Sequence, residues 1–75
     1  TTLLPLKKKE RAQKMEALAG GKSALEKQIQ QALDDKSFQW VLELTDAYLA
    51  LYPSSKTAIQ QRITALTELG KAQSN

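Results

Sequence analysis

The chain has 75 residues, with eleven Lys and Arg against eight Asp and Glu, and a formal net charge of +3. It contains no His and no Cys. This excludes the common zinc sites, a disulfide, and a Ser-His or Cys-His nucleophile pair. A chain this short makes one small domain, residues 1–75, at most. No apolar run is long enough to cross a bilayer, and nothing resembles a signal peptide.

The first predicted helix follows Pro5, a residue that suits a first helical turn. Its apolar face is expected to hold Ala12, Met15, Leu18 and Ala19. A basic run crowds the N-terminal half of this helix: Lys7, Lys8, Lys9, Arg11 and Lys14. Such a run could indicate nucleic acid or an acidic lipid surface. It has no interleaved aromatic residue and no second basic cluster, so we interpret it as a solvated helix face and expect neither a nucleic-acid nor a membrane partner.

Gly20 and Gly21 then end the helix, since one of them can take a left-handed C′ conformation. Ser23 and Glu26 have the spacing of a capping box, which predicts a second helix from Ser23. Its narrow apolar stripe is expected to be Leu25, Ile29, Ala32 and Leu33. Asp34 and Asp35 follow. Adjacent carboxylates at a helix end point apart, so they are predicted to be turn and cap residues and not metal ligands.

The stretch 37–52 is the central predicted helix, with Ser37 as N-cap and Pro53 closing it. One apolar stripe comprises Phe38, Val41, Leu42, Thr45, Tyr48, Leu49 and Tyr52, and a second comprises Trp40, Leu44, Ala47 and Leu51. Only Gln39, Glu43, Asp46 and Ala50 remain for water. A helix that is apolar nearly all round is packed on more than one side. We therefore expect the other helices to dock on it, with Trp40 enclosed.

A last helix is predicted after Ser54 or Ser55, either of which can serve as its N-cap. Its buried stripe is expected to be Ile59, Ile63 and Leu66, with Ala58 and Leu69 as further candidates. Arg62 lies beside this stripe and is expected to extend to solvent or to pair with a carboxylate. Gly70 is a natural C′ residue, so residues 71–75 are expected to fray.

Four helices joined by short turns predict an all-α fold: a compact four-helix domain of antiparallel helical hairpins, tetratricopeptide-like. The ending Ala50–Ser55 is similar to that repeat. A repeat array needs three or more units, and the chain shows no 34-residue period.

Three stretches, in this order, resemble one family. They are PLKKKERAQKMEALAGG, FQWVLELTDAYLALYP and AIQQRITALTELGKAQSN. The family is the dimerisation domain of the alkyl sulfatases built on the metallo-β-lactamase fold. The chain departs from it at Asp35–Ser37, where the family often has Gly-Asp, and at Tyr52-Pro53, where it often has an acidic Asp-Pro turn.

The resemblance implies a parent enzyme that hydrolyses sulfate esters of alkyl alcohols at a two-zinc centre in a separate, preceding hydrolase domain. The family's zinc ligands are His and acidic residues of that domain, so none is carried over to this chain, and we expect no cofactor here. Several family members are bacterial and periplasmic or secreted. For this chain the compartment stays open.

The leading hypothesis is a non-catalytic homodimerisation module of a zinc-dependent alkyl sulfatase-like hydrolase. Its expected partners are a second copy and the parent's own hydrolase domain. The candidate core or interface residues are Leu3, Leu4, Leu6, Met15, Phe38, Trp40, Leu44, Leu51 and Tyr52. The alternative is a stand-alone tetratricopeptide-like adaptor that binds a peptide or a partner helix. Without His or Cys, the chain is not expected to be an enzyme by itself.

Overall fold

The computed structural model describes residues 3–73, and the side chains of residues 7–72. Over this range the backbone forms four helices and no strand. They are α1 (Leu3–Ala19), α2 (Lys22–Asp34), α3 (Phe38–Leu51) and α4 (Lys56–Gln73). The all-α, four-helix prediction is therefore confirmed, while the tetratricopeptide-like arrangement stays an expectation.

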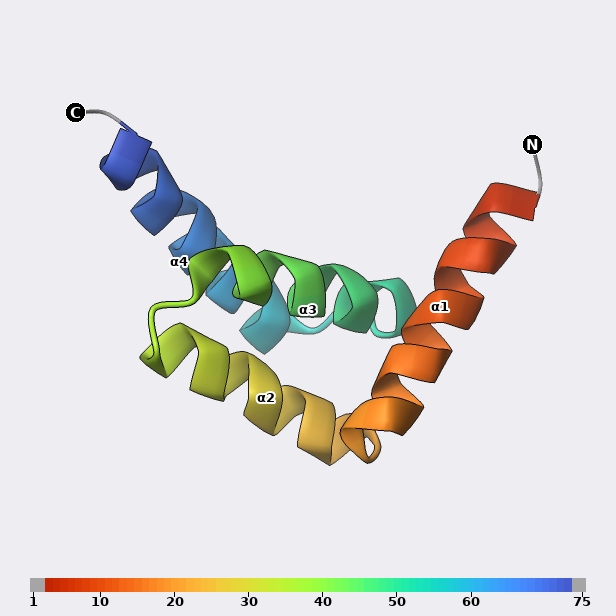
Figure 1. The fold of residues 1–75 in the computed structure, drawn as a ribbon. Helices are drawn as coiled ribbons and strands as arrows, with labels where there is room; N and C mark the ends of the chain where they lie inside the picture. The colour runs from red at the N-terminus through yellow and green to blue at the C-terminus, as the bar shows by residue number, and fades with distance from the viewer. Residues whose placement is uncertain (1–2, 74–75) are drawn as a thin grey trace.

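Helix α3 is the element on which the domain is built. It packs against each of the other three helices, whereas α1 and α4 do not touch each other within the described residues. Figure 1 shows α3 across the middle, with α1 and α4 at its two sides and α2 along the lower edge. The prediction that the other helices dock on α3 is confirmed.

The core lies where α3 meets its neighbours. Its buried residues are Leu25, Ile29, Ala32, Val41, Leu44, Tyr48, Ala58 and Ala65. The stripe predicted for α2 is confirmed, with Leu33 half-buried at its end. Both stripes of α3 contribute to the core, the first through Val41 and Tyr48 and the second through Leu44. Thr45 is fully buried and donates its hydroxyl to the carbonyl of Val41 at 2.7 Å. A buried hydroxyl is stable there because its hydrogen bond is made within the helix.

The turn between α1 and α2 depends on two glycines. Gly20 and Gly21 have φ angles of 109° and 111°, in a region that residues with a Cβ rarely adopt. Gly21 donates its N–H to the carbonyl of Glu16 at 2.8 Å, which closes the end of α1. The predicted capping box is wrong. Helix α2 begins one residue earlier, with Gly21 at its N-cap and no side-chain cap.

The turn between α2 and α3 places Lys36 in the left-handed region, with φ 61°. The N–H of Lys36 bonds to Leu33 and that of Ser37 to Ala32, so two carbonyls at the end of α2 are satisfied. A left-handed conformation favours glycine. This fits the Gly-Asp that the resembled family often has in this turn. Asp35 is the C-cap of α2, as the sequence predicted for a turn residue.

Helix α4 starts as predicted and ends later than predicted. The Oγ of Ser55 accepts the N–H of Ala58 at 3.2 Å, which confirms Ser55 as a cap. Gly70 does not end the helix. It lies inside α4, which continues to Gln73, so the predicted fraying of residues 71–73 is wrong. A glycine lowers helix stability by about 1 kcal/mol relative to alanine, and this cost is too small to stop a helix whose earlier turns are packed.

Candidate self-association surface on helix α4

Helix α4 packs on α3 through its smallest side chains. Ala58 and Ala65, seven residues apart on one face, are both buried. Between them Arg62 reaches across to α3, where its Nη1 donates to the carbonyl of Leu42 at 2.8 Å and to the Oγ1 of Thr45 at 3.2 Å. The expectation that Arg62 extends to solvent or pairs with a carboxylate is therefore wrong. Small side chains let the two helix backbones approach, and the guanidinium group spans the remaining gap.

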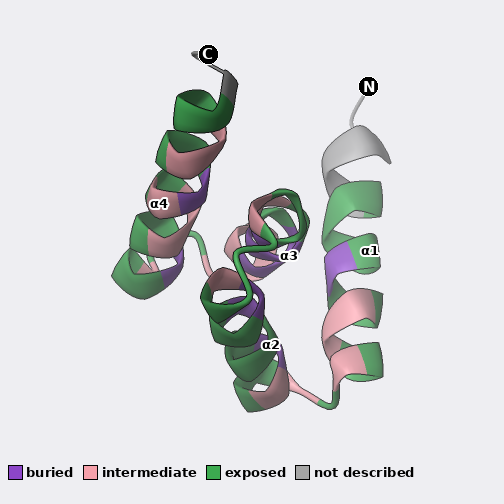
Figure 2. Ribbon diagram, turned by 60° about the vertical axis from the view of Figure 1, so that its left-hand side comes forward, coloured by how far each residue is buried: buried purple, intermediate pink, exposed green. Residues whose placement is uncertain are grey.

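The larger apolar residues of α4 consequently point elsewhere. Ile59, Ile63 and Leu66 expose 40%, 48% and 51% of their surface, and we call them the α4 apolar face. They had been predicted to form the buried stripe of this helix, and that prediction is wrong. Figure 2 shows the buried parts of α4 directed toward α3 and much of its other side exposed. Larger branched side chains between the two helices would hold α4 away from α3. The face with Ala58 and Ala65 is therefore the one that packs against α3.

The residues that border the α4 apolar face are mostly uncharged. At helical spacing, Gln60 and Thr67 border it and Gly70 continues it toward the C-terminus. Two charged residues stand at helical spacing to it: Lys56, three residues before Ile59, and Arg62, whose guanidinium group is directed to α3. A contiguous, neutral and apolar strip of this kind has the character of a protein–protein contact and not of a solvated helix face.

The residues predicted as core or interface are distributed differently. Leu3, Leu4 and Leu6 lie outside the described side chains. Leu44 is buried inside the chain, so it is core and not interface. Met15, Phe38, Leu51 and Tyr52 are half-buried.

Trp40 is 50% exposed, so the prediction that it is enclosed is wrong. It lies next to α1, where Leu18 is 89% exposed although it was assigned to the apolar face of that helix. Met15 and Ala19, from the same predicted face, are half-buried, and Ala12 is buried. The face of α1 is therefore narrower than its sequence pattern indicated.

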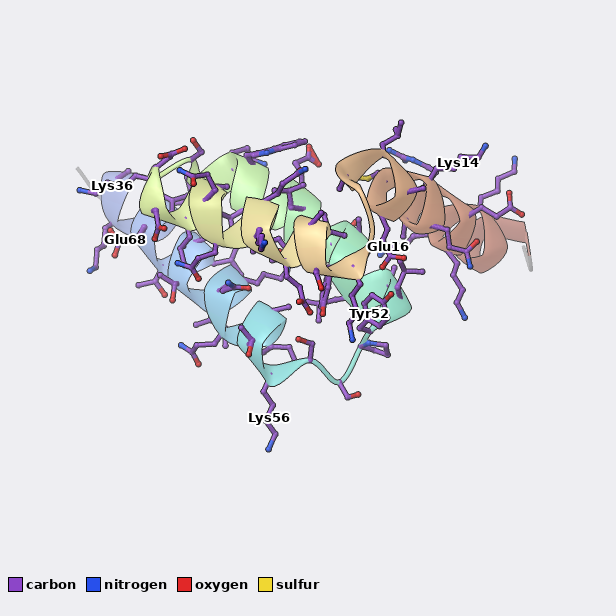
Figure 3. The ribbon with its side chains drawn as sticks, turned by 90° about the horizontal axis from the view of Figure 1, so that it is seen from below. Lys14, Glu16, Lys36, Tyr52, Lys56 and Glu68 are labelled. Carbon is purple, nitrogen blue, oxygen red and sulfur yellow. The ribbon has the colours of Figure 1, made fainter. Side chains whose placement is uncertain are left out.

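Two tyrosines at the C-terminal end of α3 tie it to α1 and α2. Tyr48 donates its hydroxyl to a carboxylate oxygen of Glu26, and Tyr52 donates to Glu16 at 2.5 Å. Their ring centroids are 4.8 Å apart, and the Nζ of Lys22 lies 4.5 Å above the Tyr52 ring. Glu16 and Tyr52 are labelled side by side in Figure 3. Glu26, which had been assigned to a capping box, thus joins two helices instead.

This cluster predicts a loss of stability at alkaline pH. Burial, and then the hydrogen bond to Glu26, raise the pKa of Tyr48 from 10.0 to about 12. The hydrogen bond to Glu16 raises the pKa of Tyr52 above its ordinary value. Because the unfolded chain loses these protons first, their stabilisation is complete below pH 10 and is lost as the pH rises toward 12.

We expect the free energy of unfolding to fall more steeply between pH 10 and 12 in the natural chain than in Tyr48→Phe. The two chains differ only at residue 48, so the difference between their profiles isolates the contribution of Tyr48. Urea unfolding followed by circular dichroism at each pH measures this. Parallel profiles would show that Tyr48 does not contribute.

The described residues hold no group of three or more His, Cys, Asp or Glu side chains placed to bind a metal ion. No described helix is both long and apolar enough to cross a membrane.

The family comparison agrees with the resemblance read from the sequence. The family described as alkyl sulfatase dimerisation matches the chain over residues 1–75. The chain belongs to this family and is a dimerisation domain. Comparison with curated proteins and with solved structures gave no significant match.

Proposed function

We propose that this chain is the homodimerisation module of a zinc-dependent hydrolase that cleaves alkyl sulfate esters. In this proposal it is not catalytic, and zinc is held by the parent's own hydrolase domain, as the family resemblance implies. The observation that carries the proposal is the α4 apolar face. Three branched side chains, each about half exposed, lie in one neutral strip on the outside of the domain.

A second copy of the chain is the occupant that fits this strip. In a two-fold contact each α4 packs against the other, so the same residues are covered on both sides. The strip repeats at Ile59, Ile63 and Leu66, with Gly70 in line, which is the spacing at which two helices interlock. Its lack of charge means that placing it against itself brings no like charges together.

The contact is expected to be weak in this chain alone. Fully burying one such side chain is worth about 1.5–3 kcal/mol, and these are half-buried already. The gain is therefore modest compared with the cost of bringing two molecules together. We expect a dimer that dissociates at concentrations on the order of tens of micromolar.

The test is to place a charge in the face and measure mass by sedimentation equilibrium. Ile63→Glu should convert the dimer to the monomer throughout the concentration range, because a carboxylate cannot be desolvated against its symmetric copy. Leu18→Glu is the matched control, since Leu18 is a more exposed apolar residue on the far side of α3. It should leave the dimer unchanged.

Other outcomes are equally informative. Dissociation by Leu18→Glu and not by Ile63→Glu would place the contact on α1 and overturn the assignment of the α4 apolar face. A natural chain that is a single 8.3 kDa species at all concentrations would contradict self-association and favour the adaptor function.

A further inference from the structure

We propose that Gly70 receives the side chain of Ile59 from a second copy of the chain, so that two α4 helices pair in the antiparallel direction. This inference rests on the proposed dimer and goes beyond it. A two-fold contact through the α4 apolar face can place the two helices antiparallel or parallel. The two arrangements bring different residues of the two copies together, so they are distinguishable by experiment.

The α4 apolar face and Gly70 follow a spacing that is the same in both directions along the helix. From Ile59 the steps are four, three and four residues, to Ile63, Leu66 and Gly70. Alternating steps of this kind keep one line of residues against a neighbouring helix. Against a reversed copy of the helix, Ile59 faces Gly70 and Ile63 faces Leu66.

The antiparallel direction fills every layer of the contact with at least one large side chain, because each glycine faces an isoleucine. In the parallel direction Gly70 would face Gly70, and no side chain would fill the space between the two backbones. Atoms that line such a void lose their packing contacts. Packing therefore favours the antiparallel pair.

Gly70 is open to receive a side chain. It is exposed, and a Cβ added there would meet nothing within 4 Å. It lies inside α4 and its φ is not positive, so the backbone conformation does not require glycine. Glycine is also a weak helix former. A residue without a side chain at this position does allow another molecule to approach the backbone closely.

The end of α4 is not covered by the rest of the domain. Among the residues with described side chains, Ala65 is the last buried residue of this helix. Figure 1 shows the last turns of α4 extending beyond α3. In the antiparallel pair the first turns of the second α4 lie along these last turns, so both uncovered ends are packed at once.

Charge favours the same direction. Lys56 lies three residues before Ile59, and Figure 3 shows its side chain extending to solvent. In a parallel pair the two Lys56 ammonium groups would face each other and repel. In the antiparallel pair they lie about 25 Å apart along the helix axis, well beyond the screening length of about 8 Å at physiological salt.

Disulfide trapping tests the direction of pairing, because the chain has no Cys of its own. The variants Ile59→Cys and Gly70→Cys are mixed and oxidised at a concentration where the natural chain is dimeric, and the products are identified by mass spectrometry. The antiparallel pair should give the mixed disulfide. Neither variant should cross-link to itself, since its two copies of the substituted residue lie about 16 Å apart, beyond the limit of roughly 7 Å between bridged Cα atoms.

Gln61→Cys and Ala72→Cys form the matched control pair. They have the same eleven-residue separation in the sequence and lie two residues further along, on the other side of the helix. Gln61 is directed to α2, where its Nε2 donates to Gln30 at 3.1 Å. This pair should give no mixed disulfide. Control cross-linking as fast as that of the test pair would indicate random collision and would overturn the proposal.

Lys56→Gln gives a second readout that needs no cysteine. The dissociation constant of the dimer should change by less than about twofold, because Lys56 is remote from its copy in the antiparallel pair. A decrease of about fivefold or more would show that the two Lys56 residues repel each other, and would overturn the antiparallel direction.

The results separate the direction of pairing from the dimer itself. A dimer in which Ile59→Cys and Gly70→Cys each cross-link only to themselves would leave the proposed function in place and overturn the antiparallel pair. A dimer that gives no disulfide with either variant would overturn the contact at Gly70. A monomeric natural chain in the sedimentation experiment would contradict the proposed dimer, and the pairing with it.

Discussion

Leu44→Ala is expected to lower the free energy of unfolding by about 3 kcal/mol, within the range seen for buried leucines. Leu44 is almost completely buried at the centre of α3, among residues of the shared core. Removing its branched end leaves a cavity that helices packed on several sides of α3 cannot close easily. For a domain of this size the melting temperature should fall by roughly 15 °C.

Trp40→Ala provides the comparison within the same predicted stripe. Although tryptophan is much larger than leucine, Trp40 is half exposed, so we expect a loss of only about 1 kcal/mol. Thermal unfolding followed by circular dichroism measures both variants. If Trp40→Ala cost more than Leu44→Ala, Trp40 would be enclosed after all, as its sequence pattern had indicated.

Ala65→Leu is expected to destabilise the domain by about 2 kcal/mol, because it adds volume at a fully packed position where α4 meets α3. Ala65 is fully buried at that seam. Alanine and leucine have similar helix propensities, so the effect reports packing and not helix formation.

The control for this substitution is Ala72→Leu, at an exposed position on the same helix. It should change the free energy of unfolding by less than about 0.5 kcal/mol. Equal effects at the two positions would mean that Ala65 is not the contact that sets the distance between α3 and α4. Urea unfolding of the three chains decides this.

The number and type of the helices were predictable because each is bounded by local signals. Gly20-Gly21, the turn before Phe38 and the Pro53–Ser55 break all act within a few residues, and the central helix is apolar on nearly every side. These signals need no knowledge of distant contacts. The docking of the other helices on α3 followed from the same pattern.

The orientation of α4 was not predictable from apolar periodicity alone. This helix carries two adjacent stripes, one of large apolar residues and one of alanines. Apolar periodicity alone favours burying the stripe of large residues. The residues that decide between them lie on α3, since Arg62 bonds to Leu42 and Thr45. A usable signal was present in Ala58 and Ala65, whose seven-residue spacing favours a close helix contact.

Glu26 and Trp40 were missed for a related reason. The local sequence pattern predicted Glu26 as a capping partner and Trp40 as a buried aromatic residue. In both cases the outcome depends on residues from elsewhere in the chain. Tyr48 lies 22 residues from Glu26 in the sequence and donates its hydroxyl hydrogen to the Glu26 carboxylate. On the α1 side, Ala12 and Met15 pack beside Trp40 without covering it, which leaves half of the indole in water.

The position of α3 within the chain also sets the order in which the domain can form during synthesis. Helices α1 and α2 leave the ribosome first, but their main packing partner is α3, and they contact each other less. Until residue 51 has emerged, Leu25 and Ile29 lack the helix against which α2 packs most extensively. The first half of the domain is therefore expected to stay loosely structured, and to consolidate only when α3 arrives. Helix α4 then docks last, which presents its outward face to a second chain only after the rest of the domain is in place.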